Sequence, residues 1–426
     1  MVAFELVRGM RDYIGEDAEK IRYIESVFRN LVLKYGYMEI ISPIVEEFRL
    51  FALKGGEELK QTMYVFKDKA NRELALRPEI TPSVARAYIQ YLQSLPKPVR
   101  LFYFGTVYRY DEPQYGRYRE FRQAGVELIG DSSVFSDIEI LDLLYNFYHR
   151  LNLSNSIIIK INNIGIFRKI MNDYNIDENM QEHILHLIDK NKIDEAINII
   201  SKKIDSNDVT ESIRKLLDKK NLTTNDLKEL IEEKDFIKLN IRDELLYLLK
   251  IANILSRLNI NFKIDLGFVR GLAYYTRLIF EVLHPSVPFS IAGGGRYDRL
   301  IEIYGGLPAP AIGFAIGVER TLLVTKIMKN NEVTNIVIIV MSDELIPQAI
   351  NIANILRREG YTVIINTKSQ PLSKLLPHYA SQNFKIAIIV GKQEFERNQV
   401  TIKNLQTKSQ TTIPADNVVD ALKQML

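Results

Sequence analysis

Residues 103–128 read YFGTVYRYDEPQYGRYREFRQAGVEL, and this stretch decides the fold. The runs 101–110 and 117–130 are rich in aromatic and aliphatic residues, and the polar segment DEPQYG lies between them. Two strand-like runs joined by a short loop that contains Pro and Gly are typical of a β-hairpin. We therefore predict an antiparallel sheet in this part of the chain.

Alternate positions of the second run carry a mixed set of residues. They are Arg117, Arg119, Phe121, Gln123, Gly125 and Glu127. Because alternate residues of a strand share a face, that face would carry cations at one end and an amide and a carboxylate further along. Such a face would suit one elongated polar ligand with a phosphate-bearing end, and Arg109 would add a cation from the first run. The alternative is a solvated strand whose charges form weak cross-strand ion pairs.

Glycine-rich segments appear later in the chain. They are FVRGLAYYTR (268–277), AGGGRYDRL (292–300) and AIGFAIGVER (311–320). Consecutive glycines destabilise a strand, so we interpret them as positions where a ligand or another backbone approaches closely. The alternative for each segment is an ordinary turn or bulge. The last segment has the pattern of a strand that leads into a helix.

The hydrophobic pattern divides the chain into parts. Apolar residues recur with the 3.6-residue period of a helix over 17–36. A region rich in Lys, Asn and Asp with helical periodicity interrupts the strand-like segments. Beyond a polar linker at 329–335, apolar strands alternate with helices, which is typical of a small α/β domain with helices on both faces of its sheet. The expected parts are 1–160 and 259–328 for a sheet domain, 161–258 for a helical insertion, and 335–426 for the α/β domain.

Composition limits the functions open to the chain. Its 426 residues carry 56 Lys and Arg against 53 Asp and Glu, a net charge of +3, so any nucleic-acid binding must come from local clusters. The absence of cysteine excludes disulfides, thiolate nucleophiles and cysteine-ligated metals, and it fits the cytoplasm, where we expect the protein. No apolar run approaches the ~18 residues that span a bilayer, so we expect no membrane partner.

Several common catalytic motifs are missing from the sequence. It contains no GxxxxGK[ST] phosphate loop and no GxGxxG, HExxH or GxSxG motif. His183 and His186 lie three positions apart in the helical region without a clear carboxylate partner. We therefore assign these two residues to the surface or to packing rather than to a metal site.

The order of the sequence blocks resembles that of the histidyl-tRNA synthetase family, a branch of the class II aminoacyl-tRNA synthetases. The blocks are RGMRD (8–12), LRPEIT (76–81), YRYDEPQYGRYREFRQAGVELIG (108–130), FVRGLAYYTR, GGGRYDRL and AIGFAIGVER. The resemblance covers nearly the whole chain. It implies an α+β fold, in which an antiparallel-sheet catalytic domain carries a helical insertion and is followed by a C-terminal α/β domain of the anticodon-binding type.

The same resemblance implies a reaction. Members of this family activate L-histidine with ATP, in the presence of Mg²⁺, to histidyl-adenylate and pyrophosphate, and they then transfer histidine to the 3′ end of tRNA(His). The resemblance also implies a homodimer, whose interface would include the helix over 17–36 and the strand that follows it. We expect no editing domain, because a pocket that hydrogen-bonds both imidazole nitrogens rejects analogues strongly.

Residue roles follow from the matched motifs. Arg109 and Arg270 would be catalytic and hold the α-phosphate, and Arg320 would stack on adenine. The residues that the resemblance assigns to histidine are Glu79, Thr81, Arg109, Gln123, Glu127, Arg270, Tyr274, Tyr275 and Tyr297, with Glu127 and Tyr275 on the imidazole. The residues assigned to ATP are Arg109, Asp111, Arg117 and Arg320. Glu112 and Gln114 would touch the acceptor end of the tRNA.

Three positions depart from the family pattern, and two alternative functions stay open. Ala273 stands where the family usually has Asp, Asp111 where it often has Glu, and Glu112 where a basic residue is frequent. One alternative is the catalytically inactive, histidine-sensing regulatory subunit of ATP phosphoribosyltransferase, which typically lacks the C-terminal domain and catalytic arginines. The other is an ATP-dependent amidating ligase that forms acyl-adenylates without tRNA.

Overall fold

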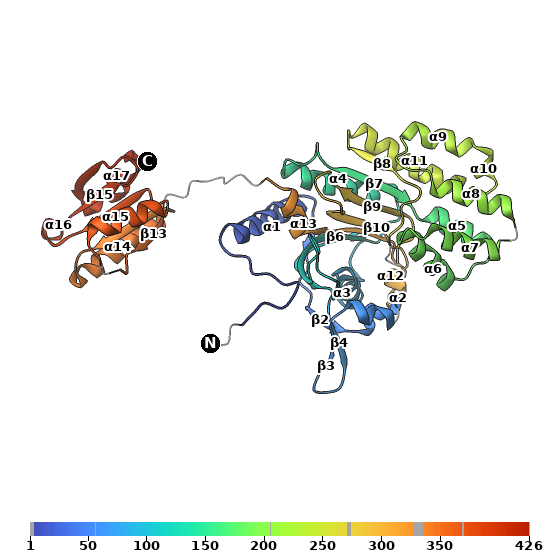
Figure 1. Ribbon diagram of the computed structural model, residues 1–426, viewed down its shortest axis with the longest axis horizontal. Helices are drawn as coiled ribbons and strands as arrows, with labels where there is room; N and C mark the ends of the chain where they lie inside the picture. Colours follow the sequence, from blue (N-terminus) through green and yellow to red (C-terminus); the bar gives the residue numbers. More distant parts are fainter. Residues whose placement is uncertain are drawn as a thin grey trace. The chain divides into compact units, whose positions relative to one another are not determined.

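Two compact units, Met1–Ile327 and Met328–Leu426, make up the chain (Figure 1). The computed structural model describes residues 4–55, 57–204, 206–270, 274–326, 335–368 and 370–425, without the side chains of 54–59. Of the linker predicted at 329–335, only Asn335 lies within these residues, and it begins a strand. Among the helices in the described ranges, none has both the length and the apolar character that a membrane span requires.

An eight-stranded sheet forms the centre of the first unit (Figure 1). In spatial order its strands are β1 (Met38–Glu39), β5 (Val99–Tyr108), β6 (Glu120–Ile129), β11 (Ala311–Gly317), β10 (Ala292–Arg296), β9 (Leu278–Leu283), β7 (Ile158–Asn163) and β8 (Phe262–Ile264). Every neighbouring pair from β5 to β7 is antiparallel, while β1 pairs with β5 and β8 with β7 in parallel. The predicted antiparallel sheet is confirmed.

The predicted hairpin consists of β5 and β6, and the two faces of β6 have different surroundings. Ala124, Val126 and Leu128 point into the hydrophobic core. The intervening Gln123 and Glu127 point to the opposite face, where they line a cavity. The alternation read from the sequence therefore separates core residues from site residues along the length of this strand.

Three helices pack against β6 and β11 and against one another. They are α1 (Glu16–Lys34), α4 (Val134–Arg150) and α13 (Val318–Val324). The first corresponds to the helix predicted over 17–36, and the chain turns after it at Gly36, whose φ is +78°. Phe28 packs edge-on against Phe102 of β5 and Phe147 of α4, with ring centroids 6.3 and 5.7 Å apart. These aromatic contacts join the helices to the sheet.

A small antiparallel sheet and several short helices complete the N-terminal part of this unit. The sheet has the order β2 (Val45–Glu47), β4 (Glu73–Leu76) and β3 (Val65–Lys67), and the helices are α2 (Arg49–Gly55), the 3₁₀-helix η1 (Glu57–Thr62), α3 (Thr81–Ala87) and the π-helix η2 (Tyr88–Leu92). Arg77, directly after β4, donates to the carbonyls of Ser42 and Thr106, each at 2.9 Å. This buried guanidinium ties the 76–81 segment to β5.

The predicted helical insertion consists of α5 (Gly165–Asp173), α6 (Glu178–Asp189), α7 (Ile193–Lys203), α8 (Asn207–Leu217), α9 (Thr224–Glu232), α10 (Lys234–Ile237) and α11 (Arg242–Arg257). Its predicted start at residue 161 needs correction, because residues 161–163 belong to β7 of the central sheet. The sequence of this strand, IIKINN, mixes Ile with Lys and Asn and so resembles the polar helical region that follows. A further short helix, α12 (Leu300–Ile303), follows β10.

The second unit is the predicted α/β domain. Its sheet has the order β13 (Thr362–Ile365), β12 (Asn335–Val340), β14 (Ile386–Val390), β15 (Gln399–Asn404) and β16 (Gln410–Pro414), and its helices are η3 (Asp343–Leu345), α14 (Ile346–Arg358), α15 (Leu372–Ser381), α16 (Lys392–Glu396), η4 (Ala415–Asn417) and α17 (Val418–Met425). Ile336 and Ile338 of β12 share a core with α14 and α17, whereas Val337 and Ile339 share one with α15. The sheet is therefore covered on both faces, as predicted, although its last two strands run antiparallel.

Candidate active site

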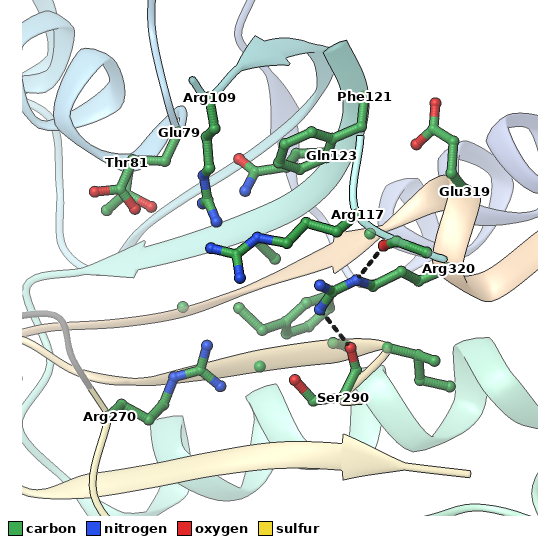
Figure 2. Close-up of a pocket in the computed structure, with 18 of the residues that line it drawn as sticks. Glu79, Thr81, Arg109, Arg117, Phe121, Gln123, Arg270, Ser290, Glu319 and Arg320 are labelled. Atoms are coloured by element: carbon green, nitrogen blue, oxygen red, sulfur yellow. Dashed lines mark hydrogen bonds between the residues drawn. The ribbon is translucent and has the colours of Figure 1, made fainter. Parts of the chain in front are cut away.

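A cavity of about 330 Å³ lies on the face of the sheet that Gln123 and Glu127 share (Figure 2). Its walls come from stretches far apart in the sequence: the 76–81 segment, the β5–β6 hairpin, Arg270 with residues of the 274–297 region, and β11 with the start of α13. It is lined by Glu79, Thr81, Arg109, Asp111, Arg117, Gln123, Glu127, Arg270, Tyr274, Tyr275, Tyr297 and Arg320. The fold thus gathers every residue that the resemblance assigned to histidine or ATP.

Two glycines on neighbouring strands make room for charged side chains in this cavity. A Cβ atom on Gly313 of β11 would overlap with Oε2 of Glu127, and one on Gly293 of β10 would overlap with Nη1 of Arg270. Any side chain at either position would therefore displace the charged group. The close approach predicted for the consecutive glycines is confirmed, but at Gly293 the approaching group is a side chain of the protein itself.

Glu127 is the most deeply buried carboxylate of the cavity, with 1% of its surface exposed. The hydroxyls of Thr81 and Tyr103 donate to its Oε1 at 2.7 and 3.3 Å, and the hydroxyl of Tyr297 donates to its Oε2. Burial removes hydration from the ionised form and raises the pKa of Glu127 to about 7, while the three hydrogen bonds act in the opposite direction. This carboxylate can therefore gain or lose a proton near neutral pH.

Glu79 is a second carboxylate of the cavity, and it faces the cations. The hydroxyl of Tyr274 donates to its Oε2 at 2.9 Å. Desolvation raises the pKa of Glu79, and the positive charges of Arg109 and Arg270, together with this hydrogen bond, oppose the rise. The arrangement would suit an ammonium group bound between the carboxylate and the tyrosines.

Three arginines make another part of the cavity positive (Figure 2). Nε of Arg109 donates to the carbonyl of Pro78 at 3.0 Å, and Nη1 of Arg270 donates to the carbonyl of Phe280 at 3.2 Å. Within the described part of the chain, neither of them nor Arg320 forms an ion pair. Partly buried cations held by neutral acceptors attract an anionic ligand.

Arg320 is the most constrained of the three. Its Nε donates to the carbonyl of Gly116 at 2.8 Å and its Nη1 to that of Ser290 at 3.0 Å, and its guanidinium carbon lies 4.7 Å from the ring centre of Phe289. Burial, together with repulsion from the other arginines of the cavity, lowers the pKa of Arg320 to about 10. The side chain stays charged at neutral pH, and a bound anion would relieve the repulsion.

The prediction that Arg117 and Arg119 share the face of Gln123 is only half right. Because β6 begins at Glu120, the alternation of the strand does not extend back to them. Arg117 lines the cavity and pairs with Asp111 at 2.7 Å. Arg119 instead donates from Nε to the carbonyl of Asp111 at 3.0 Å and stacks over Tyr110, 4.2 Å from the ring centre, so it stabilises the hairpin loop.

Gln123 contributes an acceptor that lacks a partner among the described residues. Its Oε1 is buried and makes no hydrogen bond there, although the side chain lines the cavity and is 7% exposed overall. An unpaired buried acceptor is unfavourable, and native proteins contain few of them. A donor on a ligand in the cavity would complete this hydrogen bond.

The two residues expected to touch tRNA lie in the hairpin loop rather than in the cavity wall. Glu112 forms an ion pair with Arg8 of the RGMRD segment, and both side chains are mostly exposed. Gln114 makes an isolated β-bridge with Arg117 at the turn. The pair with Arg8 offsets the negative charge that Glu112 brings to this loop. Ala273, the other notable departure from the family pattern, lies outside the described residues.

Some lining residues received no role from the sequence. They are Gly116, Tyr118, Phe121, Ser290, Ile291, Ala292, Phe314, Ala315, Gly317 and Glu319. Glu319 could have been found from its place directly before Arg320 at the start of a helix. Strand alternation did place Phe121 on the face of Gln123, but without a role. By contrast Arg296, which follows the three glycines, is buried in an ion pair with Asp137 at 2.6 Å and serves the core.

A resident metal site is not built into the described residues. They contain no group of three or more His, Asp or Glu that could hold an ion. Glu319 lines the cavity, but it already accepts bonds from the backbone N–H and the guanidinium of Arg122, each at 2.9 Å. Mg²⁺ commonly takes most of its oxygen ligands from phosphates and water. The residues present therefore fit Mg²⁺ that enters with a nucleotide, and Glu319 would bind it through a lone pair that the bonds from Arg122 leave free.

Comparison with known proteins identifies the family. The family model described as histidyl-tRNA synthetase matches residues 9–321, and the model described as anticodon binding domain matches residues 335–425. The histidine–tRNA ligases of Saccharolobus islandicus (strain M.16.27) and Saccharolobus solfataricus (strain P2) are 69% and 68% identical over 426 residues, which is all of this chain and all of theirs.

Solved structures agree with this assignment. The apo histidyl-tRNA synthetase of S. aureus is 27% identical with a TM-score of 0.71, covering 98% of this chain and 99% of that one. The histidyl-tRNA synthetase of Nostoc sp. PCC 7120, 22% identical with a TM-score of 0.76 and full coverage of both chains, shares the fold. From the matched family models, the full-length relatives and the α+β fold we conclude that this chain belongs to the histidyl-tRNA synthetase family.

Proposed function

We propose that the protein is a histidine–tRNA ligase, which activates L-histidine with ATP and transfers it to tRNA(His). The observation that carries this proposal is the composition of a single cavity. One part holds a buried carboxylate surrounded by hydroxyls, and another holds arginines without ion-pair partners in the described residues. The first suits a neutral imidazole and the second suits a triphosphate, so the two substrates of the activation step would lie side by side.

Recognition of histidine would rest on Glu127 and Tyr275. A neutral imidazole has one N–H donor and one acceptor nitrogen. The Glu127 carboxylate would accept the N–H, and the Tyr275 hydroxyl would serve the other nitrogen. Tyr274 and Tyr297 would pack around the ring, while Glu79, Thr81 and Gln123 would meet the α-amino group. An amino acid that lacks the imidazole would leave buried polar groups unpaired, which lowers its binding strongly.

Activation needs two anions to approach one another. A carboxylate oxygen of histidine forms a bond to the α-phosphorus of ATP, and the bond from that phosphorus to the bridging oxygen breaks, so that pyrophosphate leaves. The nucleophile is already ionised, so no general base is needed. Arg109 would bind the substrate carboxylate and the α-phosphate together, and Arg270 would approach the α-phosphate from the side of β10. These two arginines would hold the reacting atoms in line.

Electrostatics make this role for the arginines quantitatively reasonable. A unit charge pair at ~4 Å and an effective dielectric constant near 20 interacts by about 4 kcal/mol before desolvation. Arg109 and Arg270 are already partly buried and lack ion-pair partners in the described residues, so part of their desolvation takes place on folding. Mg²⁺ bound with ATP would neutralise charge on the departing pyrophosphate, with Glu319 available as a ligand.

The nucleotide would extend from these arginines toward Arg320 and Phe121. Arg117 and Asp111 lie along the same wall, where Arg117 would bind the outer phosphates. Arg320 would stack its guanidinium on adenine, an interaction that planar cations make well with aromatic rings. In this arrangement the purine would lie against the start of α13 and the triphosphate along the hairpin.

Transfer to tRNA would use both units. The hydroxyl of the terminal ribose attacks the carbonyl carbon of the adenylate, and AMP leaves. Glu112 and Gln114, on the exposed hairpin loop, would meet the acceptor end. The second unit would bind the anticodon, for which Lys392 of α16, Arg397 directly after this helix and Lys408, all exposed, offer phosphate contacts. We also propose a homodimer, because Leu33, Met38, Ile41 and Ile44 leave exposed apolar surface at α1 and β1.

The regulatory-subunit alternative is not favoured. The full-length relatives at 68–69% identity are histidine–tRNA ligases, and the chain keeps both Arg270 and Arg320 in the cavity and has the second unit. The amidating-ligase alternative is disfavoured by the same relatives. A solved structure described as an ATP phosphoribosyltransferase regulatory subunit/histidyl-tRNA synthetase, from Bacillus halodurans C, is 23% identical and shows only that the fold is shared.

The activation step is tested by Arg270→Ala in histidine-dependent ATP–pyrophosphate exchange. Removing one preorganised cation at a site of developing charge should lower kcat about 10²- to 10³-fold, with a smaller change in histidine affinity. Arg299→Ala is the matched control, because Arg299 pairs with Glu178 on the surface at 3.3 Å and does not line the cavity. Exchange that stays at the wild-type level in Arg270→Ala would remove this residue from the mechanism.

The transfer step is tested by truncation after residue 327, which removes the second unit. We expect the rate of tRNA charging to fall by orders of magnitude while ATP–pyrophosphate exchange remains measurable, because the cavity lies entirely within the first unit. Equal loss of both activities would contradict separate roles for the two units. Charging of purified tRNA pools with each labelled amino acid would test the substrate assignment directly.

A further inference from the structure

The loop between β9 and β10 contains a phenylalanine at the back of the nucleotide part of the cavity. This loop reads HPSVPFSI over residues 284–291, and Phe289 lies near its end. Ser290 and Ile291 are among the described residues that line the cavity, but Phe289 is not. Phe289 is partly buried, and its ring contacts Arg320 and Tyr115.

The first partner of this ring is Arg320. The guanidinium carbon lies 4.7 Å from the ring centre of Phe289, within the distance of a cation–π interaction. The carbonyl of Ser290, the next residue, accepts a hydrogen bond from Nη1 of Arg320 at 3.0 Å (Figure 2). Two consecutive residues of the loop therefore hold one guanidinium, one through its face and one through its edge.

The second partner of the ring is the hairpin loop between β5 and β6. Tyr115 packs against Phe289 with ring centroids 6.0 Å apart. A Cβ atom on Gly116 would overlap with the ring, and the φ of this glycine is +69°, a conformation that disfavours other residues. The carbonyl of Gly116 in turn accepts from Nε of Arg320 at 2.8 Å. Phe289 thus contacts both Arg320 and the segment that hydrogen-bonds Arg320.

A force that opposes these contacts is also present. Arg320 shares the cavity with Arg109, Arg117 and Arg270, and repulsion among them favours a side chain turned away from the site before ATP binds. The ring of Phe289 and the two carbonyls act against this movement. They hold the guanidinium beside the cavity while the site is empty, which reduces the ordering that binding must achieve.

We propose that Phe289 is a positioning residue for ATP binding, which holds Arg320 and the Tyr115–Gly116 turn in the arrangement that receives the adenine ring. The inference rests on the proposed role of Arg320 toward adenine. It goes beyond that role by assigning the preorganisation of this arginine to a loop residue that does not line the site.

The experiment compares Phe289→Leu with Phe289→Tyr in histidine-dependent ATP–pyrophosphate exchange. Leucine keeps most of the apolar volume but removes the aromatic face, so the KM for ATP should rise about three- to tenfold, the range expected for loss of a partly desolvated cation–π contact. The KM for histidine should change less than twofold. Tyrosine keeps the ring, so its KM for ATP should stay within about twofold of the wild-type value.

The matched control is Phe395→Leu in α16 of the second unit, which should leave both KM values unchanged. A merely structural role for Phe289 predicts a different outcome, in which kcat and both KM values change together and tyrosine gives no rescue. That outcome would overturn the inference, as would an unchanged KM for ATP in Phe289→Leu. If Phe289→Leu does not fold, the test uses Phe289→Tyr and Tyr115→Ala. A raised KM for ATP in Phe289→Tyr would overturn the inference. An unchanged KM for ATP in Phe289→Tyr, together with a raised KM for ATP in Tyr115→Ala, would support it.

Arg320→Ala separates this inference from the function on which it rests. If Arg320→Ala raises the KM for ATP and Phe289→Leu does not, the proposed function stands and the positioning role fails. If Arg320→Ala itself leaves the KM for ATP unchanged, the adenine assignment fails, and the role of Phe289 fails with it. In the double variant Phe289→Leu/Arg320→Ala, the effects should be far from additive, because both changes remove the same contact.

Discussion

The pKa of Glu127 leads to a pH dependence that can be worked out from the structure. Burial raises this pKa to about 7, so the carboxylate exists above pH 7 and is lost as the pH falls through that value. Its ionised fraction should be about nine-tenths at pH 8 and about one-tenth at pH 6, whereas a glutamate with an ordinary pKa near 4.3 would be ionised throughout this range. If only the carboxylate accepts the imidazole N–H, the titration of Glu127 by itself should lower kcat/KM for histidine about tenfold from pH 8 to pH 6.

The perturbation that isolates this group is Glu127→Gln. Glutamine keeps the size and one acceptor but does not titrate, so the acid limb contributed by Glu127 should disappear. At pH 8 the variant should also have a kcat/KM for histidine about 10- to 100-fold below wild type, because a hydrogen bond to a charged group contributes about 1.5–3 kcal/mol. The KM for ATP should be nearly unchanged, since the arginines of the nucleotide part do not contact this carboxylate.

The assay is ATP–pyrophosphate exchange at saturating ATP and limiting histidine between pH 6 and pH 8. The imidazole of the substrate titrates in the same range, but it does so equally for both proteins. The ratio of wild-type to Glu127→Gln kcat/KM therefore reports the enzyme carboxylate alone, and it should change about tenfold over this interval. A ratio that is independent of pH over this interval would refute the reasoning.

Two further predictions concern side chains held by their neighbours. Gly293→Ala should displace the Arg270 guanidinium and lower kcat for exchange nearly as much as Arg270→Ala does, and adding it to Arg270→Ala should change little; additive effects would show that the two positions act independently. Asp137→Asn should destabilise the first unit by up to about 3–5 kcal/mol, because it removes the buried ion-pair partner of Arg296 and leaves this arginine paired with the partly exposed Asp298 at 3.1 Å. The measurement is thermal or denaturant unfolding, with the exposed Asp194→Asn as a control that should change stability by less than about 1 kcal/mol.

Periodicity in the sequence was sufficient to predict an element and its buried face where one physical rule decides the structure. The alternation along 120–129 separates core from cavity because a strand has only two faces, and the 3.6-residue pattern over 17–36 gives a helix because its apolar stripe must be buried. It failed where the chain leaves regular structure. Strand alternation was applied to Arg119, although this residue lies in the loop before β6 begins. Residues 161–163 were assigned to the helical region because their sequence, INN, is as polar as that region, although they belong to a strand inside the sheet.

The candidate site was predictable in part, for a related reason. Charged residues such as Arg109 and Arg270 stand out in the sequence, because a charged side chain within or beside a strand has few structural roles. The resemblance to the family then assigned them roles. Phe289 could not be found in this way. An apolar residue in a proline-containing loop has many ordinary explanations, and only the three-dimensional contact with Arg320 distinguishes it. Arg296 shows that a charge beside glycines does not by itself mark a site, because this arginine is buried in an ion pair with Asp137 in the core.

The glycines of β10 and β11 have a consequence for how this enzyme could change its substrate range. At the base of the pocket these glycines have no side chain, and a charged group of the protein occupies the space that a side chain would need. Each of these groups has a proposed role in selectivity or in the reaction. Adding even one methyl group at Gly313 would evict Glu127, and adding one at Gly293 would evict Arg270. Redesign toward another amino acid must therefore begin at the side chains around the pocket, Thr81 or the tyrosines, rather than at these two glycines.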